Sequence, residues 1–166
     1  MSFPLDNPAD AGAGAEMRKL AEVLATGQPA ITPHRVLGDI VVGVGKSGKG
    51  GYGLTHIIER RAQQGKSTAE IAAILYLINQ ALRDGEILPH PNPNRQTLNN
   101  RGIVAIIERQ DGGKWLLTGY DDFSQKKEAT DAITAVIANY GYAPDYSYVC
   151  NQVGAVVTSR RASIVN

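Results

Sequence analysis

The sequence is short of cysteine, of net charge and of long apolar runs. Its one cysteine, Cys150, excludes an internal disulfide framework and indicates a reducing compartment. Its 17 basic residues nearly balance 16 acidic ones, so the net charge of +1 argues against a protein that coats nucleic acid by bulk attraction. No apolar run approaches the roughly 18 residues of a membrane span, and residues 1–8 lack the basic start and apolar stretch of a signal peptide. Any anion site must therefore be a local cluster of cations.

The chain has enough apolar residues for a core, 43% of its 166 residues. This length predicts one domain, or a domain with a tail. We expect a lead-in and helix over 1–30, a single α+β domain over 31–158 and a tail over 159–166.

Apolar residues recur at intervals of three and four in four segments, which predicts helices. These segments are 16–25, 54–63, 68–83 and 126–140. The first belongs either to this domain or, as a leader helix, to a longer parent protein. Ser67 and Glu70 have the spacing of a capping box, in which each side chain bonds the other residue's backbone amide. On the second helix His56, Glu59 and Arg60 share a face away from the apolar one.

Short runs rich in β-branched residues predict strands in three regions. The regions are 31–44, broken by glycine; 102–120, a hairpin turning at 111–113; and 146–157. In the second strand of the hairpin, alternation places Trp115 and Leu117 on one face and Thr118 and Tyr120 on the other. The proline-rich stretch 88–100 is expected to be neither a helix nor an interior strand.

The glycine-rich loop 43–53 matches the start of a nucleotide-binding loop, because four residues separate Gly43 from Gly48 and Lys49 follows directly. Such a loop needs Ser or Thr next, to hold magnesium, and a helix that starts there to face the phosphate. Here Gly50 follows, and three more residues delay the helix. The pattern therefore argues against a nucleotide hydrolase.

A second interpretation keeps the cations of this loop without the nucleotide. Lys46 and Lys49, with Arg60 and Arg61 of the next helix, form a local basic cluster beside His56. Histidine titrates near neutrality and serves as acid or base, and RNA cleavage by 2′-hydroxyl attack needs only a base, an acid and cations. The alternative is that His56 is an ordinary boundary histidine and the arginines are solvated.

Other chemistry has little support in the sequence. The three histidines, His34, His56 and His90, are far apart, and no cysteine or carboxylate stands at metal-ligand spacing from them. Cys150 is expected to be a small core residue, and Trp115 and the tyrosines are expected in the core rather than as a platform for bases. We therefore predict no metal and no cofactor.

Two segments together resemble a known family. LTHIIERR at 54–61, on a helix, and KWLLTGYD at 114–121, at the end of a hairpin, are similar to the phage-associated toxin domains of the barnase–EndoU–colicin–RelE superfamily. The resemblance covers residues 31–121. It implies an α+β fold in which N-terminal helices pack on a small antiparallel sheet, here with an extra C-terminal helix and strands. It also implies a metal-independent endoribonuclease, with tRNA as one candidate substrate.

The resemblance also assigns roles to residues. It implies a catalytic set of His56 as acid or base, Arg60 to stabilise the phosphate, and Thr118 and Tyr120 to position the phosphate or protonate the leaving oxygen. It implies substrate-binding cations at Lys46, Lys49, Arg61, Arg101 and Lys114. Arg61 stands where the family often has a second histidine, which passes the missing acid–base role to Tyr120, Glu59 or another group.

A toxin of this kind implies RNA as substrate, a cognate immunity protein and delivery by a phage or a parent toxin. It would act in the cytoplasm of a target or host cell, or travel in a phage particle. Two rivals remain. One is a catalytically inactive phage structural or injected internal protein with the same fold. The other is a nucleotidyl- or ADP-ribosyl-transferring toxin, for which the sequence has no acidic catalytic motif.

Overall fold

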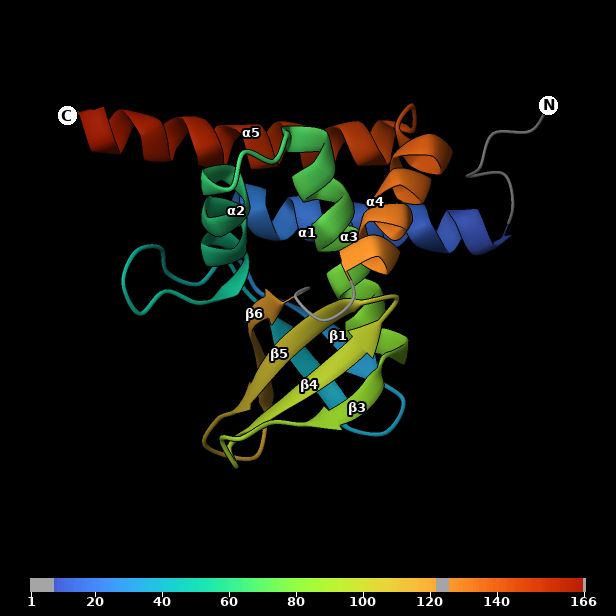
Figure 1. The fold of residues 1–166 in the computed structure, drawn as a ribbon, viewed down its shortest axis with the longest axis vertical. Helices are drawn as coiled ribbons and strands as arrows, with labels where there is room; N and C mark the ends of the chain where they lie inside the picture. Colours follow the sequence, from blue (N-terminus) through green and yellow to red (C-terminus); the bar gives the residue numbers. More distant parts are fainter. Residues whose placement is uncertain (1–7, 122–125, 166) are drawn as a thin grey trace.

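The computed structural model describes residues 8–121 and 126–165, and within them the chain forms one sheet and a group of helices packed on it (Figure 1). The helices are α1 (Pro8–Thr26), α2 (Gly53–Gln63), α3 (Thr68–Asp84), α4 (Lys126–Tyr140) and α5 (Pro144–Val165). The strands are β1 (Ala30–His34), β2 (Gly38–Val42), β3 (Glu86–Pro89), β4 (Arg95–Asn100), β5 (Ile103–Arg109) and β6 (Trp115–Asp121). The expected α+β class is confirmed.

The sheet has the order β1-β2-β6-β5-β4-β3. Neighbouring strands are antiparallel except β2 and β6, which run parallel, so the sheet is mixed. The predicted hairpin over 102–120 is confirmed as β5 and β6. The region 31–44, for which one or two strands were expected, forms two, β1 and β2.

Helix α3 lies at the centre of the core. All residues from Ile71 to Asn79 are buried, and the helix contacts α1, α2, α4 and α5 on one side and strands of the sheet on the other. A helix buried on all sides has no polar face, and its one buried amide, Asn79, has partners. The Asn79 side chain accepts a hydrogen bond from the Thr32 hydroxyl (2.7 Å) and donates one to Glu16. The predicted capping box is present at its start, where Ser67 and Glu70 bond each other's amides.

The expectation for 88–100 is partly wrong, because β4 is an interior strand paired with both β3 and β5. The prolines that argued against a strand lie elsewhere: Pro89 ends the edge strand β3, while Pro91 and Pro93 lie in the connection to β4. Within β4, Leu98 alone is fully buried among polar neighbours. One apolar residue in six carries little periodic signal, which is why the sequence pattern did not indicate a strand.

The expected C-terminal strands over 146–157 are wrong, because this segment belongs to helix α5. Tyr146, Val149 and Val153 are buried and recur at intervals of three and four, which places them on one helical stripe against α1, α2 and α3. The β-branched residues of the segment suggested a strand, but packing overrides this weak preference. The helix continues through residues 159–165, where a tail was expected, and Figure 1 shows it running across the helical side of the molecule.

Helix α1 contributes Met17, Leu20 and Ala21 to the same core as α3 and α5. It extends over more residues than the predicted 16–25. In the part of the chain that the structure describes, no helix combines the length and the apolar character needed to cross a membrane.

The helical assignment of α5 leads to a stability test. Val153→Ala should lower the free energy of unfolding by about 2 kcal/mol, because it leaves a cavity at a fully buried site. Asn151→Ala, on the exposed side of the same helix, should change it by less than about 0.5 kcal/mol. Urea unfolding of both variants checks this. Equal losses would contradict the helix, because a strand would put residues 151 and 153 on one face.

Candidate functional site

An open cleft of about 330 Å³ lies where the loop before α2 meets the face of the sheet turned away from the helices, here called the outer face. On β4, β5 and β6, Leu98, Ile107 and Leu117 are fully buried on the side of the helices. Because side chains alternate along a strand, the next residue on each strand faces the outer side. The cleft is lined by Gly50, Gly51 and Tyr52 from the loop and by Arg95, Glu108, Gln110, Leu116 and Thr118 from the sheet.

The loop wall is held to α2 through its backbone. No side chain caps the start of α2; instead the carbonyl oxygens of Gly43 and Val44 accept hydrogen bonds from the amides of Leu54 (3.1 Å) and Thr55 (2.9 Å). A side chain at Gly45 would meet the Tyr52 carbonyl oxygen at 1.9 Å. The glycines thus serve close backbone packing. Because the amides of Leu54 and Thr55 are already bonded, they are not available to a phosphate, which adds to the case against a nucleotide-binding loop.

His56 lies in the first turn of α2, directly behind the loop. A Cβ added to Gly51 would lie 2.6 Å from its Nδ1, and this nitrogen is buried without a hydrogen-bond partner among the described residues. Burial lowers the pKa of His56, the charges of Arg60 and Arg61 lower it further, and the Glu59 carboxylate opposes them. The ring is therefore mainly neutral at pH 7. Because Gly51 also lines the cleft, His56 is separated from the cleft by this glycine.

Glu59, considered as a replacement acid or base, is buried and anchors the loop. Its Oε1 accepts a hydrogen bond from the backbone amide of Gly48 at 3.2 Å. The two arginines that follow differ from each other. Arg60 is exposed, whereas Arg61 is only 7% exposed and its guanidinium lies 4.4 Å from the centroid of the Tyr120 ring. Arg61 is therefore packed between α2 and the sheet.

The predicted shared face of Thr118 and Tyr120 is wrong. The register of β5 and β6 slips by one residue between Ile106 and Ile107, which leaves Thr118 without a partner in the register and reverses the alternation after it. Tyr120 pairs with the buried Ala105 and faces the helices, while Thr118 lines the cleft and donates a hydrogen bond to the Ile106 carbonyl at 3.1 Å.

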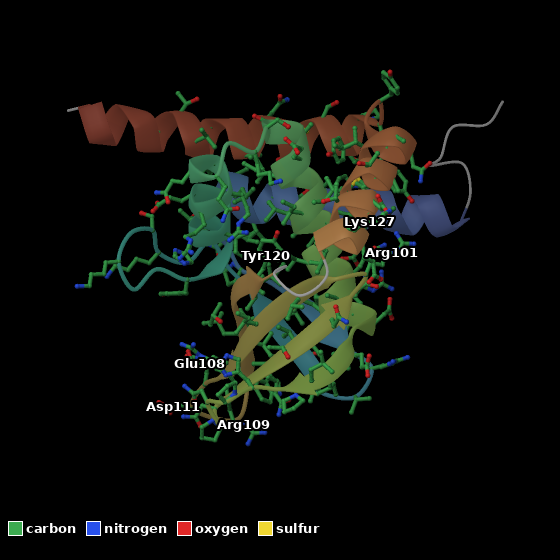
Figure 2. The ribbon with its side chains drawn as sticks, in the orientation of Figure 1. Arg101, Glu108, Arg109, Asp111, Tyr120 and Lys127 are labelled. Atoms are coloured by element: carbon green, nitrogen blue, oxygen red, sulfur yellow. The ribbon has the colours of Figure 1, made fainter. Side chains whose placement is uncertain are left out.

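The predicted substrate-binding cations are spread over the molecule. Lys46 and Lys49 are exposed on the loop, and Lys114 is exposed at the start of β6, near the cleft end of the hairpin. Arg101 occupies the turn between β4 and β5, at the end of β5 opposite to the cleft. At roughly 3.3 Å per residue, the length of β5 puts Arg101 about 20 Å from Glu108. Figure 2 shows Arg101 far from Glu108, so Arg101 does not join this site.

Three polar cleft residues were not singled out from the sequence: Arg95, Glu108 and Gln110. A further cleft residue, Tyr52, was expected in the core with the other tyrosines, and this is wrong because its side chain is exposed on the loop. Arg95 and Glu108 are directly opposite each other on β4 and β5, and Arg95 Nε lies 3.5 Å from Glu108 Oε1. Both side chains are about one-third exposed, at 39% and 32%, so this ion pair contributes little to stability and remains open to a ligand. Alternation in β5 could have placed Glu108 outward, but only the pairing with β4 brings Arg95 to it.

Within the described residues no three His, Cys, Asp or Glu side chains are grouped so that they could hold a metal ion. Cys150 is half-buried on α5, and burial raises the pKa of its thiol, which makes it a poor nucleophile.

The charges around His56 lead to a titration test. Arg60→Ala should raise the pKa of His56, because it removes a positive charge that disfavours the imidazolium. Arg35→Ala, an exposed arginine in the turn at the far end of β2, should leave it unchanged. An NMR titration of the His56 ring measures both. A pKa that falls or stays constant in the Arg60 variant would contradict the arrangement of charges described above.

Comparisons of the chain with family models, with curated proteins and with solved structures find no match. A function therefore has to be inferred from the cleft and from the motifs of the sequence.

Proposed function

We propose that the chain is a metal-independent endoribonuclease that cleaves RNA by attack of a 2′-hydroxyl on the adjacent phosphate. The observation that supports it best is the cleft, where Arg95, Glu108 and Thr118 face the loop that covers His56. A base, an acid and cations around one phosphate are what this reaction requires.

In the proposed reaction the 2′-oxygen bonds to phosphorus and gives its proton to a base. The bond from phosphorus to the 5′-oxygen breaks, and an acid protonates that oxygen. The products are a 2′,3′-cyclic phosphate and a 5′-hydroxyl. Glu108 and His56 are the proposed acid–base pair. Gly51 covers Nδ1 of His56, so the proposal assigns the proton transfer to Nε2 and requires the loop at Gly51 to move aside when the substrate binds. Such a pair gives a bell-shaped dependence of rate on pH.

The positive charges have separate roles in this proposal. Arg95 is the fixed cation inside the cleft and stabilises the charge that develops on the phosphorane. Arg60 on α2, with Lys46 and Lys49 on the loop, attracts the RNA backbone from the exposed side. Thr118 positions the phosphate.

Arg61 and Tyr120 have no chemical role in this proposal, because they pack on each other on the helical side of the sheet. Their position is also the observation that favours the second candidate, a catalytically inactive phage structural or injected protein. Without Tyr120 and a second histidine, activity depends on Glu108 as the partner of His56.

An active nuclease further implies a cognate immunity protein in the producing cell. It also implies delivery to the cytoplasm of a target or host cell by a phage particle or a parent toxin. The exposed cations of the loop, Lys46 and Lys49, make an acidic surface on the immunity protein the expected complement.

Cleavage of a fluorescently labelled RNA in the presence of a chelator tests the proposal. His56→Ala and Glu108→Gln should each slow cleavage by at least about 100-fold, the contribution of one general acid or base. The matched variants are His90→Ala, in the connection between β3 and β4, and Glu128→Gln, exposed on α4; both should cleave at the wild-type rate. Thermal unfolding of each variant shows whether it is folded.

Expression in a bacterium provides the corresponding result in cells. Wild-type protein should degrade RNA and slow growth, whereas His56→Ala should do neither. Intact RNA and normal growth with both proteins would reject the nuclease and support the inactive protein.

A further inference from the structure

Tyr52 presents an aromatic ring on the wall of the cleft. Its exposed fraction is 41%, and the other exposed large hydrophobic residues of the described chain, Ile31, Val36 and Tyr142, do not line the cleft. A ring left open beside a polar cleft forgoes burial that would stabilise the fold. Its flat apolar surface is suited to a planar ligand.

The backbone of Tyr52 is fixed, so its ring projects from a rigid support. The amide and carbonyl of Tyr52 both bond those of Lys46, at 2.9 Å each, and its conformation is extended, with φ −157° and ψ 167°. The residue also precedes the first turn of α2. Binding at this position therefore requires little ordering of the backbone.

A cation lies next to this ring. Lys46 and Tyr52 form an isolated antiparallel bridge, and residues directly opposite in such a bridge project to the same side, with Cβ atoms about 5.5 Å apart. Lys46 is exposed. The Lys46 ammonium can bind a phosphate, and the Tyr52 ring can stack on a base. The neighbouring pair therefore matches the two parts of a nucleotide.

We propose that Tyr52 and Lys46 bind one unpaired nucleotide of the substrate, with its base stacked on the Tyr52 ring and its phosphate on the Lys46 ammonium. This inference rests on the proposed function and adds that the substrate is single-stranded at the cleft. A base inside a duplex is stacked on both sides by its neighbours, so its face is not available to Tyr52. The cleft volume of about 330 Å³ suits a single nucleotide rather than a helix.

The probe is a single-stranded 2′-O-methyl oligonucleotide, which has no free 2′-hydroxyl and is not cut, with a duplex of the same sequence as its partner. Fluorescence anisotropy should show that Tyr52→Ala binds the single strand about tenfold more weakly than wild type, as expected for loss of one stacked base. Tyr52→Phe keeps the ring and should bind as wild type does. Tyr142→Ala removes a 96% exposed tyrosine from the connection between α4 and α5 and should also have no effect.

Lys46 has its own measurement. In Lys46→Gln the slope of log affinity against log salt should become shallower by about 0.7, the value for one phosphate contact on a single strand. The duplex should bind at least about tenfold more weakly than the single strand, and Tyr52→Ala should not change that weaker binding.

The outcomes separate this inference from the nuclease activity. Equal binding of the single strand by wild type and Tyr52→Ala, equal binding of the duplex, or no binding overturns the inference, whether or not RNA is cleaved. Binding that depends on Tyr52, in a protein that leaves RNA intact, supports the inference and rejects the nuclease. Thermal unfolding of Tyr52→Ala confirms that the variant is folded, as expected for an exposed side chain.

Discussion

The uncapped start of α2 is the constraint on which the candidate site depends. Its first amides need acceptors, and the carbonyls of the glycine-rich loop supply them. To do so the loop must pack more closely than a side chain allows, because a Cβ added to Gly45 would lie 1.9 Å from the Tyr52 carbonyl oxygen and one added to Gly51 would lie 2.6 Å from His56 Nδ1. The same close packing covers Nδ1 of His56, and the backbone of Tyr52 is fixed by its hydrogen bonds to Lys46. Glycine here allows close packing between backbones, and the loop is shaped by that packing.

The second wall of the cleft depends on a local irregularity of the sheet. The slip in register between β5 and β6 turns Thr118 outward and Tyr120 inward. Tyr120 then lies beneath the Arg61 guanidinium, and such a contact contributes about 2 kcal/mol when it is shielded from water. Arg61 therefore joins α2 to the sheet, and through α2 it holds the loop wall against the sheet wall. Arg61, which the resemblance assigned to substrate binding, instead stabilises the packing of α2 on the sheet.

The small net charge of the chain agrees with the way its charges are placed. Arg95 is balanced by Glu108 inside the cleft, while Arg60, Lys46 and Lys49 are exposed around the loop. A protein of this kind attracts an anion only where such groups gather. Specificity then depends on the few side chains that line the cleft rather than on a broad positive surface.

Sequence alone determined the elements whose signals are local: the capping box before α3, the periodicity of α2 and α4, and the turn of the β5–β6 hairpin. Each depends on residues within a few positions of one another, so the pattern contains the interaction. The resemblance to toxin domains indicated His56, which lies behind the loop wall of the cleft, and Thr118, which lies on its sheet wall. Tertiary structure alone decided that β4 is interior, that α5 is helical, and that Arg95 faces Glu108. It also decided that Thr118 and Tyr120 point apart. These outcomes depend on pairing between distant segments and on burial, and a one-residue slip in register reverses every side chain beyond it.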